Sequence, residues 1–275
     1  MIPITVSQAL AAAQTLGLDR LDAQLLLLHA LGKPDTERAW LLAHDADALA
    51  EAAAEAFRHV SLRRAAGEPV AYIVGYKDFF GLRLNVDARV LVPRPDTETL
   101  VQWVLDVTLG IVSPDILDLG TGSGAVGIAI AHHVKCRVTA TDFSTDALAV
   151  ASQNAAQLGA DVQFIHSNWF EKVGGQYQVI ASNPPYIAHA DPHLAALMHE
   201  PLNALVAGQD GLGDIRQIVD HAPERLLTGG WLLLEHGHDQ AAAVRGLLAS
   251  RGFAKVQSRM DLAGIARCSG GQWDN

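Results

Sequence analysis

The chain is poor in cysteine, in basic residues and in long apolar runs. Its 275 residues include only two cysteines, Cys136 and Cys268, which are far apart and lack the spacing of a metal site. No run of about 18 apolar residues is available to span a bilayer. The N-terminal residues lack the basic and apolar pattern of a signal peptide. We therefore expect a cytoplasmic protein with reduced thiols and no membrane partner.

Basic residues are outnumbered by acidic ones. Lys and Arg total 20 against 30 Asp and Glu, which gives a formal net charge of −10. Proteins that bind nucleic acid usually neutralise its phosphates with a basic surface, so we expect no direct binding of DNA or RNA. Arg58, Arg63 and Arg64 form the one noticeable basic cluster. We interpret this cluster as a solvated helix end, and contact with an acidic or RNA-bound partner is the alternative.

The spacing of apolar residues divides the chain into three parts. At 275 residues the chain is long enough for two domains, and 49% of its residues are hydrophobic. Residues 1–70 are rich in Ala and Leu at helical spacing and predict a small all-α bundle of four or five helices. Residues 71–92 include an alternating pattern around a glycine, which predicts a β-hairpin linker. Residues 93–275 alternate strands with helices, as in an α/β domain with a doubly wound sheet.

The expected elements of residues 93–275 are short and closely spaced. Apolar and β-branched runs predict strands at 116–117, 137–142, 161–166, 177–182, 230–235, 253–260 and 265–269. Helical spacing predicts helices at 100–109, 125–131 and 146–158. The last two strands are separated by a connection too short for a helical crossover, so they must pair antiparallel.

A glycine-rich turn joins the strand at 116–117 to the helix at 125–131. It reads Asp118-Leu-Gly120-Thr121-Gly122-Ser123-Gly124. Glycines let the backbone turn sharply and approach a ligand, and the helix start adds free N–H groups. A tight turn without a ligand is the alternative, because a GxGxxG pattern alone is a weak signal. The carboxylate of Asp118 disfavours the diphosphate of a dinucleotide but suits the ammonium group of S-adenosylmethionine.

A second acid, Asp142, ends the next expected strand. It lies 18 residues beyond Gly124, where a carboxylate can accept hydrogen bonds from both hydroxyls of a ribose. Spacing, order and strand context agree. We therefore predict a nucleotide-binding site formed by the glycine-rich turn and Asp142.

The tetrapeptide Asn183-Pro184-Pro185-Tyr186 follows the expected strand at 177–182. Two prolines remove two backbone donors and fix φ, so the chain leaves the sheet as a stiff turn. The side-chain oxygen of Asn183 and the carbonyl of Pro184 can accept both hydrogens of a planar NH2 group, with Tyr186 packed on its face. A strand-ending Asn-Pro turn is the structural alternative. The glycine-rich turn upstream favours the functional interpretation.

Together, these features resemble the release-factor glutamine methyltransferase (PrmC/HemK) family of class I S-adenosylmethionine-dependent methyltransferases. Further matching segments lie between about residue 60 and the C-terminus, namely Gly67-Glu-Pro69, Val92-Pro-Arg-Pro-Asp-Thr-Glu98, Glu200-Pro201, Glu235-His-Gly237 and Asp261-Leu-Ala-Gly264. The N-terminal helical part matches in pattern rather than in wording. The resemblance implies a Rossmann-like sheet of seven strands with an antiparallel C-terminal hairpin, preceded by the all-α bundle.

The resemblance also implies a reaction and a partner. Methyl would pass from S-adenosylmethionine to the side-chain amide N5 of the glutamine in the Gly-Gly-Gln motif of class-1 peptide chain release factors, leaving S-adenosylhomocysteine. The segment 93–98 favours release factors, because relatives that modify a ribosomal-protein glutamine differ there. Catalysis falls to Asn183, Pro184 and Tyr186, and substrate binding to the whole tetrapeptide including Pro185. We expect the helical domain to dock the substrate and the protein to be a monomer.

Residues after the third strand surround the adenine in such folds. Here they are Asn168-Trp169-Phe170, whereas relatives usually carry Asp at position 168. The carbonyl of Asn168 can still accept a hydrogen bond from the adenine amino group, so we expect binding with altered affinity. We predict that Trp169 forms a wall of the cofactor site, with a core aromatic as the alternative. Asn183 is also included among the cofactor-binding residues.

Two other classes of function remain open. An adenine-N6 DNA methyltransferase uses the same tetrapeptide on a planar amino group, but it needs base flipping and a recognition domain. A non-enzymatic binding module could retain a nucleotide pocket, although the tetrapeptide beside an intact glycine-rich turn argues against it. The 12 histidines lack zinc-like spacing, so we assign no metal.

The chain itself contains Gly-Gly-Gln twice, at 174–176 and 270–272. We interpret both as coincidence in a glycine-rich chain. Self-methylation at Gln176 or Gln272 is the alternative.

Overall fold

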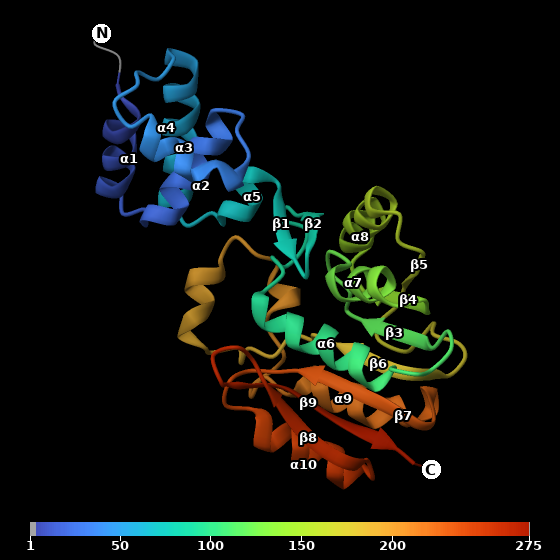
Figure 1. Cartoon of the computed structure of the whole chain (residues 1–275). Coiled ribbons are helices and arrows are strands. Elements are labelled where there is room, and N and C mark those ends of the chain that lie inside the picture. The colour runs from blue at the N-terminus through green and yellow to red at the C-terminus, as the bar shows by residue number, and fades with distance from the viewer. Residues whose placement is uncertain (1–3, 275) are drawn as a thin grey trace. The chain divides into compact units, whose positions relative to one another are not determined.

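The chain forms two compact units that divide between Tyr76 and Lys77 (Figure 1). The computed structural model describes residues 4–274. The first unit is helical, and the second is an α/β unit that starts with a β-hairpin. Residues 1–3 and 275, which belong to the expected ranges 1–70 and 93–275, lie outside the described residues.

The helical unit is a small bundle around a run of leucines. Its described helices are α1 (Val6–Thr15), α2 (Arg20–Ala30), α3 (Arg38–Ala43), α4 (Glu51–Ala65) and α5 (Val70–Val74), with a 3-10 turn η1 (Asp35–Glu37). Thr5 starts α1 with a capping box, and the carboxylate of Asp19 caps α2. Leu26, Leu27 and Leu28 are fully buried in the core of this unit. The leucine run is therefore the core of a bundle, as its short length predicts.

The basic cluster of the helical unit is locally balanced. Each of its three arginines pairs with an acidic side chain of the same unit: Arg58 with Glu55, Arg63 with Glu68 and Arg64 with Asp22. The first pair is exposed and the other two are half-buried, and ion pairs at a protein surface contribute little to stability. They do cancel the local positive charge, so the cluster is not a free basic patch.

The α/β unit begins with the hairpin β1 (Tyr76–Phe79) and β2 (Leu82–Asn85) and continues into a seven-stranded sheet. The sheet order is β5-β4-β3-β6-β7-β9-β8. Its strands are β3 (Asp115–Leu119), β4 (Arg137–Asp142), β5 (Val162–His166), β6 (Tyr177–Ser182), β7 (Leu226–Glu235), β8 (Ala254–Met260) and β9 (Ala266–Trp273). Strands β3 to β7 pair in parallel, whereas β9 pairs antiparallel with both β7 and β8.

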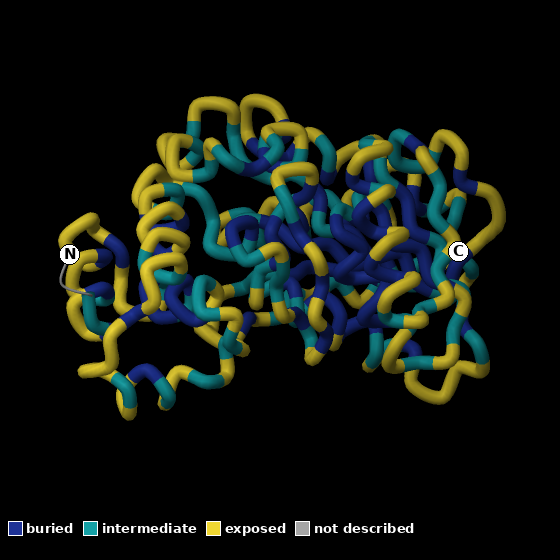
Figure 2. Tube along the Cα trace, turned by 90° about the horizontal axis from the view of Figure 1, so that it is seen from above, coloured by how far each residue is buried: buried dark blue, intermediate teal, exposed yellow. Residues whose placement is uncertain are grey.

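Helices cover both faces of the sheet (Figure 1). The helices are α6 (Glu98–Val107), α7 (Ala125–His133), α8 (Thr145–Leu158), α9 (Gly213–His221) and α10 (Ala241–Arg251). Buried side chains of α6, α7 and the hairpin share one cluster with the sheet, and those of α9 and α10 share the other. Figure 2 shows the buried trace concentrated in the middle of this unit. These layers match a doubly wound sheet.

The order of the strands locates the binding edge. The connections run from β3 outward to β4 and β5, and β6 then pairs on the other side of β3. In open α/β sheets, ligands bind at the carboxyl ends of the strands where the order reverses in this way. Residues that follow β3, β4 and β6 are therefore brought together at this edge.

The predicted fold class is confirmed, including the antiparallel pair at the end of the sheet. The strands 137–142 and 177–182 have the predicted bounds. Strand β7 starts earlier than expected, at Leu226, and β9 continues to Trp273. Glycines hid both extensions, because they carry no apolar side chain to continue the pattern. Among the described residues, no helix is both long and apolar enough to cross a membrane.

Gly270 in β9 should be intolerant of a side chain. A Cβ there would lie 2.6 Å from Leu233 Cδ2 and 2.7 Å from the carbonyl oxygen of Leu232. We expect Gly270→Ala to destabilise the chain by about 1–3 kcal/mol, because a packed core resists an added methyl group. A lower midpoint of thermal unfolding would be the measured sign.

Gly246 in α10 provides the matched control. It is exposed within a helix, and a Cβ there would meet no atom within 4 Å. We expect Gly246→Ala to raise stability by about 0.5–1 kcal/mol through helix propensity. If both variants unfolded at the same temperature as the unchanged chain, the packing described at Gly270 would be wrong.

Candidate functional site

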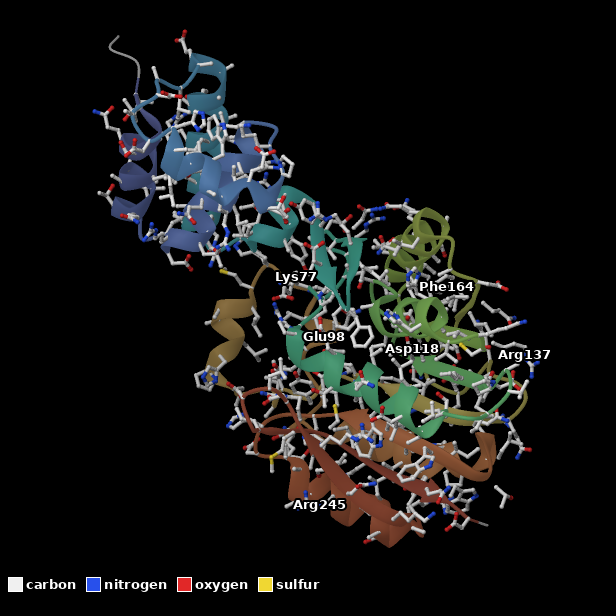
Figure 3. The ribbon with its side chains drawn as sticks, in the orientation of Figure 1. Lys77, Glu98, Asp118, Arg137, Phe164 and Arg245 are labelled. Atoms are coloured by element: carbon white, nitrogen blue, oxygen red, sulfur yellow. The ribbon has the colours of Figure 1, made fainter. Side chains whose placement is uncertain are left out.

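A cavity of about 240 Å³ lies at the carboxyl ends of the parallel strands. Its walls come from the glycine-rich turn after β3, from Asp142 to Ser144 after β4, from Ser167 to Trp169 after β5 and from the tetrapeptide after β6. Segments 89–97 and 201–204 complete it. In Figure 3, Asp118 lies toward this edge of β3, whereas Arg137 marks the opposite edge, where β4 begins.

The glycine-rich turn is held in shape by the carboxylate of Asp118. Asp118 Oδ2 accepts a hydrogen bond from Thr121 Oγ1 at 2.6 Å and one from the backbone N–H of Gly127 at 2.9 Å. Gly120, Gly122 and Gly124 all have positive φ, at 70°, 56° and 85°, a region that glycine adopts without strain. Asp118 therefore both shapes the turn and lines the cavity.

Burial controls the charge of Asp118. The residue is 1% exposed, and this burial raises the pKa of its carboxyl group to about 6. The two hydrogen bonds lower the pKa, but less than burial raises it. A cationic group in the cavity would stabilise the charged form of this carboxylate.

Asp142 links the end of β4 to the glycine-rich turn. Asp142 Oδ2 accepts a hydrogen bond from the backbone N–H of Gly122, and Oδ1 accepts one from that of Ser144, both at 2.8 Å. Burial raises the pKa of Asp142, and these backbone donors lower it. Each carboxylate oxygen retains a second acceptor position for a ligand in the cavity.

Asn168 and Trp169 both line the cavity. Asn168 Nδ2 donates to Glu171 Oε1 at 2.9 Å, so the amide oxygen of Asn168 is the group left to accept from a ligand. Trp169 has a positive φ of 45°, which is uncommon for a residue other than glycine. Its ring lies 3.4 Å from where a Cβ of Gly120 would be, so the indole packs beside the glycine-rich turn at an ordinary contact distance.

Asn183 is oriented by a hydroxyl group from the segment before α6. Asn183 Nδ2 donates to Thr97 Oγ1 at 3.2 Å, and both residues line the cavity. Because the amide nitrogen is engaged there, the oxygen of Asn183 is left as the acceptor. The carbonyl of Pro184 also accepts no hydrogen bond from the residues that the structure describes.

The other members of the tetrapeptide occupy different positions. Pro185 lines the cavity, whereas Pro184 is buried and Tyr186 packs against the core formed with α9 and α10. The Tyr186 hydroxyl donates to Glu235 Oε1 at 3.4 Å, a long hydrogen bond. Burial raises the pKa of Tyr186 well above its usual range. The phenol therefore stays neutral at physiological pH.

Glu200 joins the two segments that complete the cavity. Its buried carboxylate accepts a hydrogen bond from the backbone N–H of Val92 at 3.1 Å and one from Arg94 Nη2 at 2.5 Å. Arg94 lines the cavity, and so does Pro201, which follows Glu200. Glu200 is 6% exposed. Its bonds to Val92 and Arg94 carry no local signal in the sequence.

Three residues of this region were not identified as site residues from the sequence: Thr97, Glu200 and Glu235. All three belong to segments that carried the family resemblance, and that was the available signal. Residues 4–274 contain no group of His, Cys, Asp and Glu that could hold a metal ion.

The raised pKa of Asp118 predicts a change of stability with pH. Its carboxyl has an ordinary pKa of 3.8 and a folded pKa of about 6, so the folded chain holds the proton more tightly than the unfolded chain. This contribution is complete below pH 3.8 and is lost as the pH rises through about 6. Asp118→Asn stays neutral throughout. Relative to the unchanged chain, it should therefore gain up to about 3 kcal/mol between about pH 4 and 7.

Thermal unfolding measured across that pH range tests this expectation. Asp161→Asn, which removes an exposed carboxylate before β5, serves as the control and should follow the unchanged chain. Parallel curves for Asp118→Asn and the unchanged chain would show that the carboxyl group is not buried as described.

Two sequence families match the two parts of this chain. The PrmC N-terminal domain family matches residues 5–75, and the methyltransferase small domain family matches residues 96–209.

Solved structures share the fold at low identity. A methyltransferase from Pyrococcus furiosus is 20% identical with a TM-score of 0.56, covering 78% of this chain and 99% of its own. A 16S rRNA methyltransferase of T. thermophilus, solved with AdoMet and guanosine, is 17% identical with a TM-score of 0.53, covering 72% of this chain and 49% of its own.

Relatives in sequence are much more similar over the whole chain. The release factor glutamine methyltransferase of Bordetella pertussis is 49% identical over 93% of this chain and 95% of its own length. That of Pseudomonas aeruginosa is 48% identical over 92% of both chains. At this identity and coverage, and with both domain families present, the chain belongs to the release factor glutamine methyltransferase family.

Proposed function

We propose that this chain transfers a methyl group from S-adenosylmethionine to the side-chain amide nitrogen N5 of the glutamine in the Gly-Gly-Gln motif of class-1 release factors. Family membership supports the reaction. The observation that carries the site assignment is the orientation of Asn183. Its nitrogen donates to Thr97, which leaves its oxygen as an acceptor beside the glycine-rich turn.

The residues of the cavity fit S-adenosylmethionine. Asp118 supplies a buried carboxylate for an ammonium group, and Asp142 supplies acceptors for ribose hydroxyls. The oxygen of Asn168 suits an adenine amino group, and the indole of Trp169 provides an aromatic wall. When bound, this cofactor supplies an electrophilic sulfonium methyl group.

The protein's own contribution is to hold and polarise the substrate amide. An amide nitrogen is a poor nucleophile because its lone pair is delocalised into the carbonyl. Attack on the methyl carbon, as the carbon–sulfur bond breaks and its electron pair stays on sulfur, takes the lone pair out of conjugation and builds positive charge on nitrogen. The nitrogen then loses one proton to solvent, which gives the neutral methylated amide. The oxygens of Asn183 and Pro184 would accept the two N–H groups, stabilise that charge and aim the nitrogen. Fixed acceptors of this kind contribute a few kcal/mol each.

The chain's own Gly-Gly-Gln segments are poor candidates for methylation. Gln176 Nε2 donates to the carbonyl of Leu226 at 3.2 Å, and Gln272 Nε2 donates to that of Gly229 at 2.8 Å. Both amide nitrogens are thus held by backbone acceptors at the amino-terminal end of β7, away from the carboxyl-terminal edge that carries Asn183.

The substrate partner is a protein rather than a nucleic acid in this proposal. The net charge of −10 and the locally paired arginines of α4 disfavour a phosphate backbone. We further propose that the helical unit, residues 4–76, docks the body of the release factor and that the enzyme acts as a monomer in the cytoplasm. A docking unit separate from the cavity would explain recognition beyond three residues.

Asn183→Ala should abolish methyl transfer while largely sparing cofactor binding. Removing one positioned acceptor from a developing charge costs about 100- to 1000-fold in kcat. Transfer of labelled methyl to a release factor gives the rate, and calorimetry gives cofactor affinity. Gln153→Ala, which removes an exposed amide of α8 outside the cavity, is the control and should retain turnover. Turnover by Asn183→Ala at the unchanged rate would remove the site assignment.

The substrate class can be tested with three acceptors supplied side by side. We expect methylation of a whole class-1 release factor, slower methylation of a free Gly-Gly-Gln peptide and none of duplex DNA. The whole factor should react faster than the peptide because its body docks on the helical unit. Duplex DNA should not react because the acidic chain repels its phosphates. Methyl incorporated into DNA alone would contradict the proposed function, and equal rates on factor and peptide would contradict a docking role for the helical unit.

A further inference from the structure

A buried carboxyl group lies directly behind the tetrapeptide. Glu235 ends β7, which pairs in parallel with β6, and Ser182 is opposite Leu234 in that pair. Glu235 is therefore beside the point where β6 passes into Asn183. It is 1% exposed, which is unusual for a carboxyl group that forms no ion pair with any of residues 4–274.

The two oxygens of Glu235 have different surroundings. Oε1 accepts the long hydrogen bond from the Tyr186 hydroxyl. Oε2 is buried and makes no hydrogen bond within residues 4–274 that meets ordinary geometry. A buried acceptor left in this state is costly, so a donor close by is expected to serve it.

Thr97 is the side chain placed to be that donor. Its side chain is buried, and its hydroxyl lowers the pKa of Glu235 through hydrogen bonding. Thr97 Oγ1 is already the acceptor for Asn183 Nδ2. A hydroxyl has one hydrogen to donate, and the carboxylate of Glu235 is the charged acceptor that interacts with Thr97.

We propose that Glu235 is a positioning residue for the methyl transfer reaction: its carboxylate, acting through the hydroxyl of Thr97, fixes which end of the Asn183 amide faces the substrate. The proposal rests on the proposed function, because it assumes that Asn183 holds the substrate amide.

The direction of the hydrogen bonds carries the argument. When Glu235 is ionised, Thr97 must donate to it, so the Thr97 oxygen accepts from the NH2 group of Asn183. The oxygen of Asn183 then faces the cavity and accepts from the substrate NH2. When Glu235 is protonated, it can donate to Thr97, whose hydrogen is released toward Asn183. The amide then turns, and its NH2 group meets the NH2 group of the substrate.

The charged groups around Glu235 place this change near neutral pH. Burial raises the pKa of Glu235 to about 7. Arg267 of β9 lowers it, whereas Asp96 of the turn before α6 raises it. The Tyr186 hydroxyl also lowers it, and the neutral thiol of Cys268 in β9 lies within the same field. Turnover is therefore expected to fall as the pH drops below about 7.

The test is the pH profile of kcat at saturating cofactor and release factor. The unchanged enzyme should lose about tenfold per pH unit below about 7. Glu235→Gln cannot ionise, but its amide oxygen can still accept from Thr97. We expect Glu235→Gln to be about threefold slower than the unchanged enzyme at about pH 8 but faster at about pH 6, because its acid limb is absent. An acid limb that persists in Glu235→Gln would overturn the proposal.

Variants of Thr97 separate positioning from general damage. Thr97→Val keeps the shape but removes the hydroxyl, and it should lower kcat by about 10- to 100-fold at every pH with cofactor affinity retained. Thr97→Ser restores the hydroxyl and should recover most of kcat together with the acid limb. Thr99→Val, two residues further along in α6, is the matched control and should behave as the unchanged enzyme. Equal rates for Thr97→Val and Thr97→Ser would also overturn the proposal, and this pair decides the matter if Glu235→Gln does not fold.

Asn183→Ala distinguishes failure of this inference from failure of the proposed function. In that background, Thr97→Val should cause no further loss of turnover, because there is no amide left to orient. If Asn183→Ala retains full turnover, the proposed site itself is wrong. The other outcome is that Asn183→Ala loses most of its turnover and Thr97→Val lowers the remaining rate as much as in the unchanged chain. In that case Thr97 and Glu235 act independently of Asn183, and only the inference fails.

Discussion

Parallel pairing of β3 with β4 on one side and β6 on the other is the constraint on which the site depends. This register brings the carboxyl ends of the three strands to one edge, where Asp118, Asp142 and Asn183 lie. Two of these side chains form hydrogen bonds with segments that lie far from them in the sequence. Asp142 accepts from the glycine-rich turn after β3, and Asn183 donates to Thr97, 86 residues away. The site is thus a property of the sheet edge.

Burial raises the pKa values of two carboxyl groups at this edge of the sheet. Asp118 and Glu235 are both about 1% exposed, and burial raises the pKa of each, to about 6 and about 7. Asp118 lines the cavity and shapes the glycine-rich turn, whereas Glu235 lies behind the tetrapeptide. Two acids of similar burial can therefore serve different purposes because they lie beside different turns.

The sequence was sufficient to predict the fold and the local motifs. The motifs of Asp118 with its glycines and of Asn183 with its prolines can be recognised in the sequence, because each is contiguous and follows an apolar strand. Thr97, Glu200 and Glu235 were not identified as site residues, because their contacts join segments 86, 106 and 49 residues apart. Hydrogen bonds between such distant segments depend on the register of the sheet, which a single sequence does not reveal. The full lengths of β7 and β9 were missed because buried glycines interrupt their apolar pattern.

The position of β9 between β7 and β8 has a consequence for how this edge of the sheet is held together. Strand β8 precedes β9 in the chain, yet it joins the sheet only through β9. The five parallel strands pair with one another without β8, whereas β8 has no hydrogen-bonded neighbour in the sheet until β9 lies between it and β7. Strand β9 also carries Arg267, whose charge acts on Glu235. The strand that holds β8 in the sheet thus also completes the electrostatic environment behind the tetrapeptide.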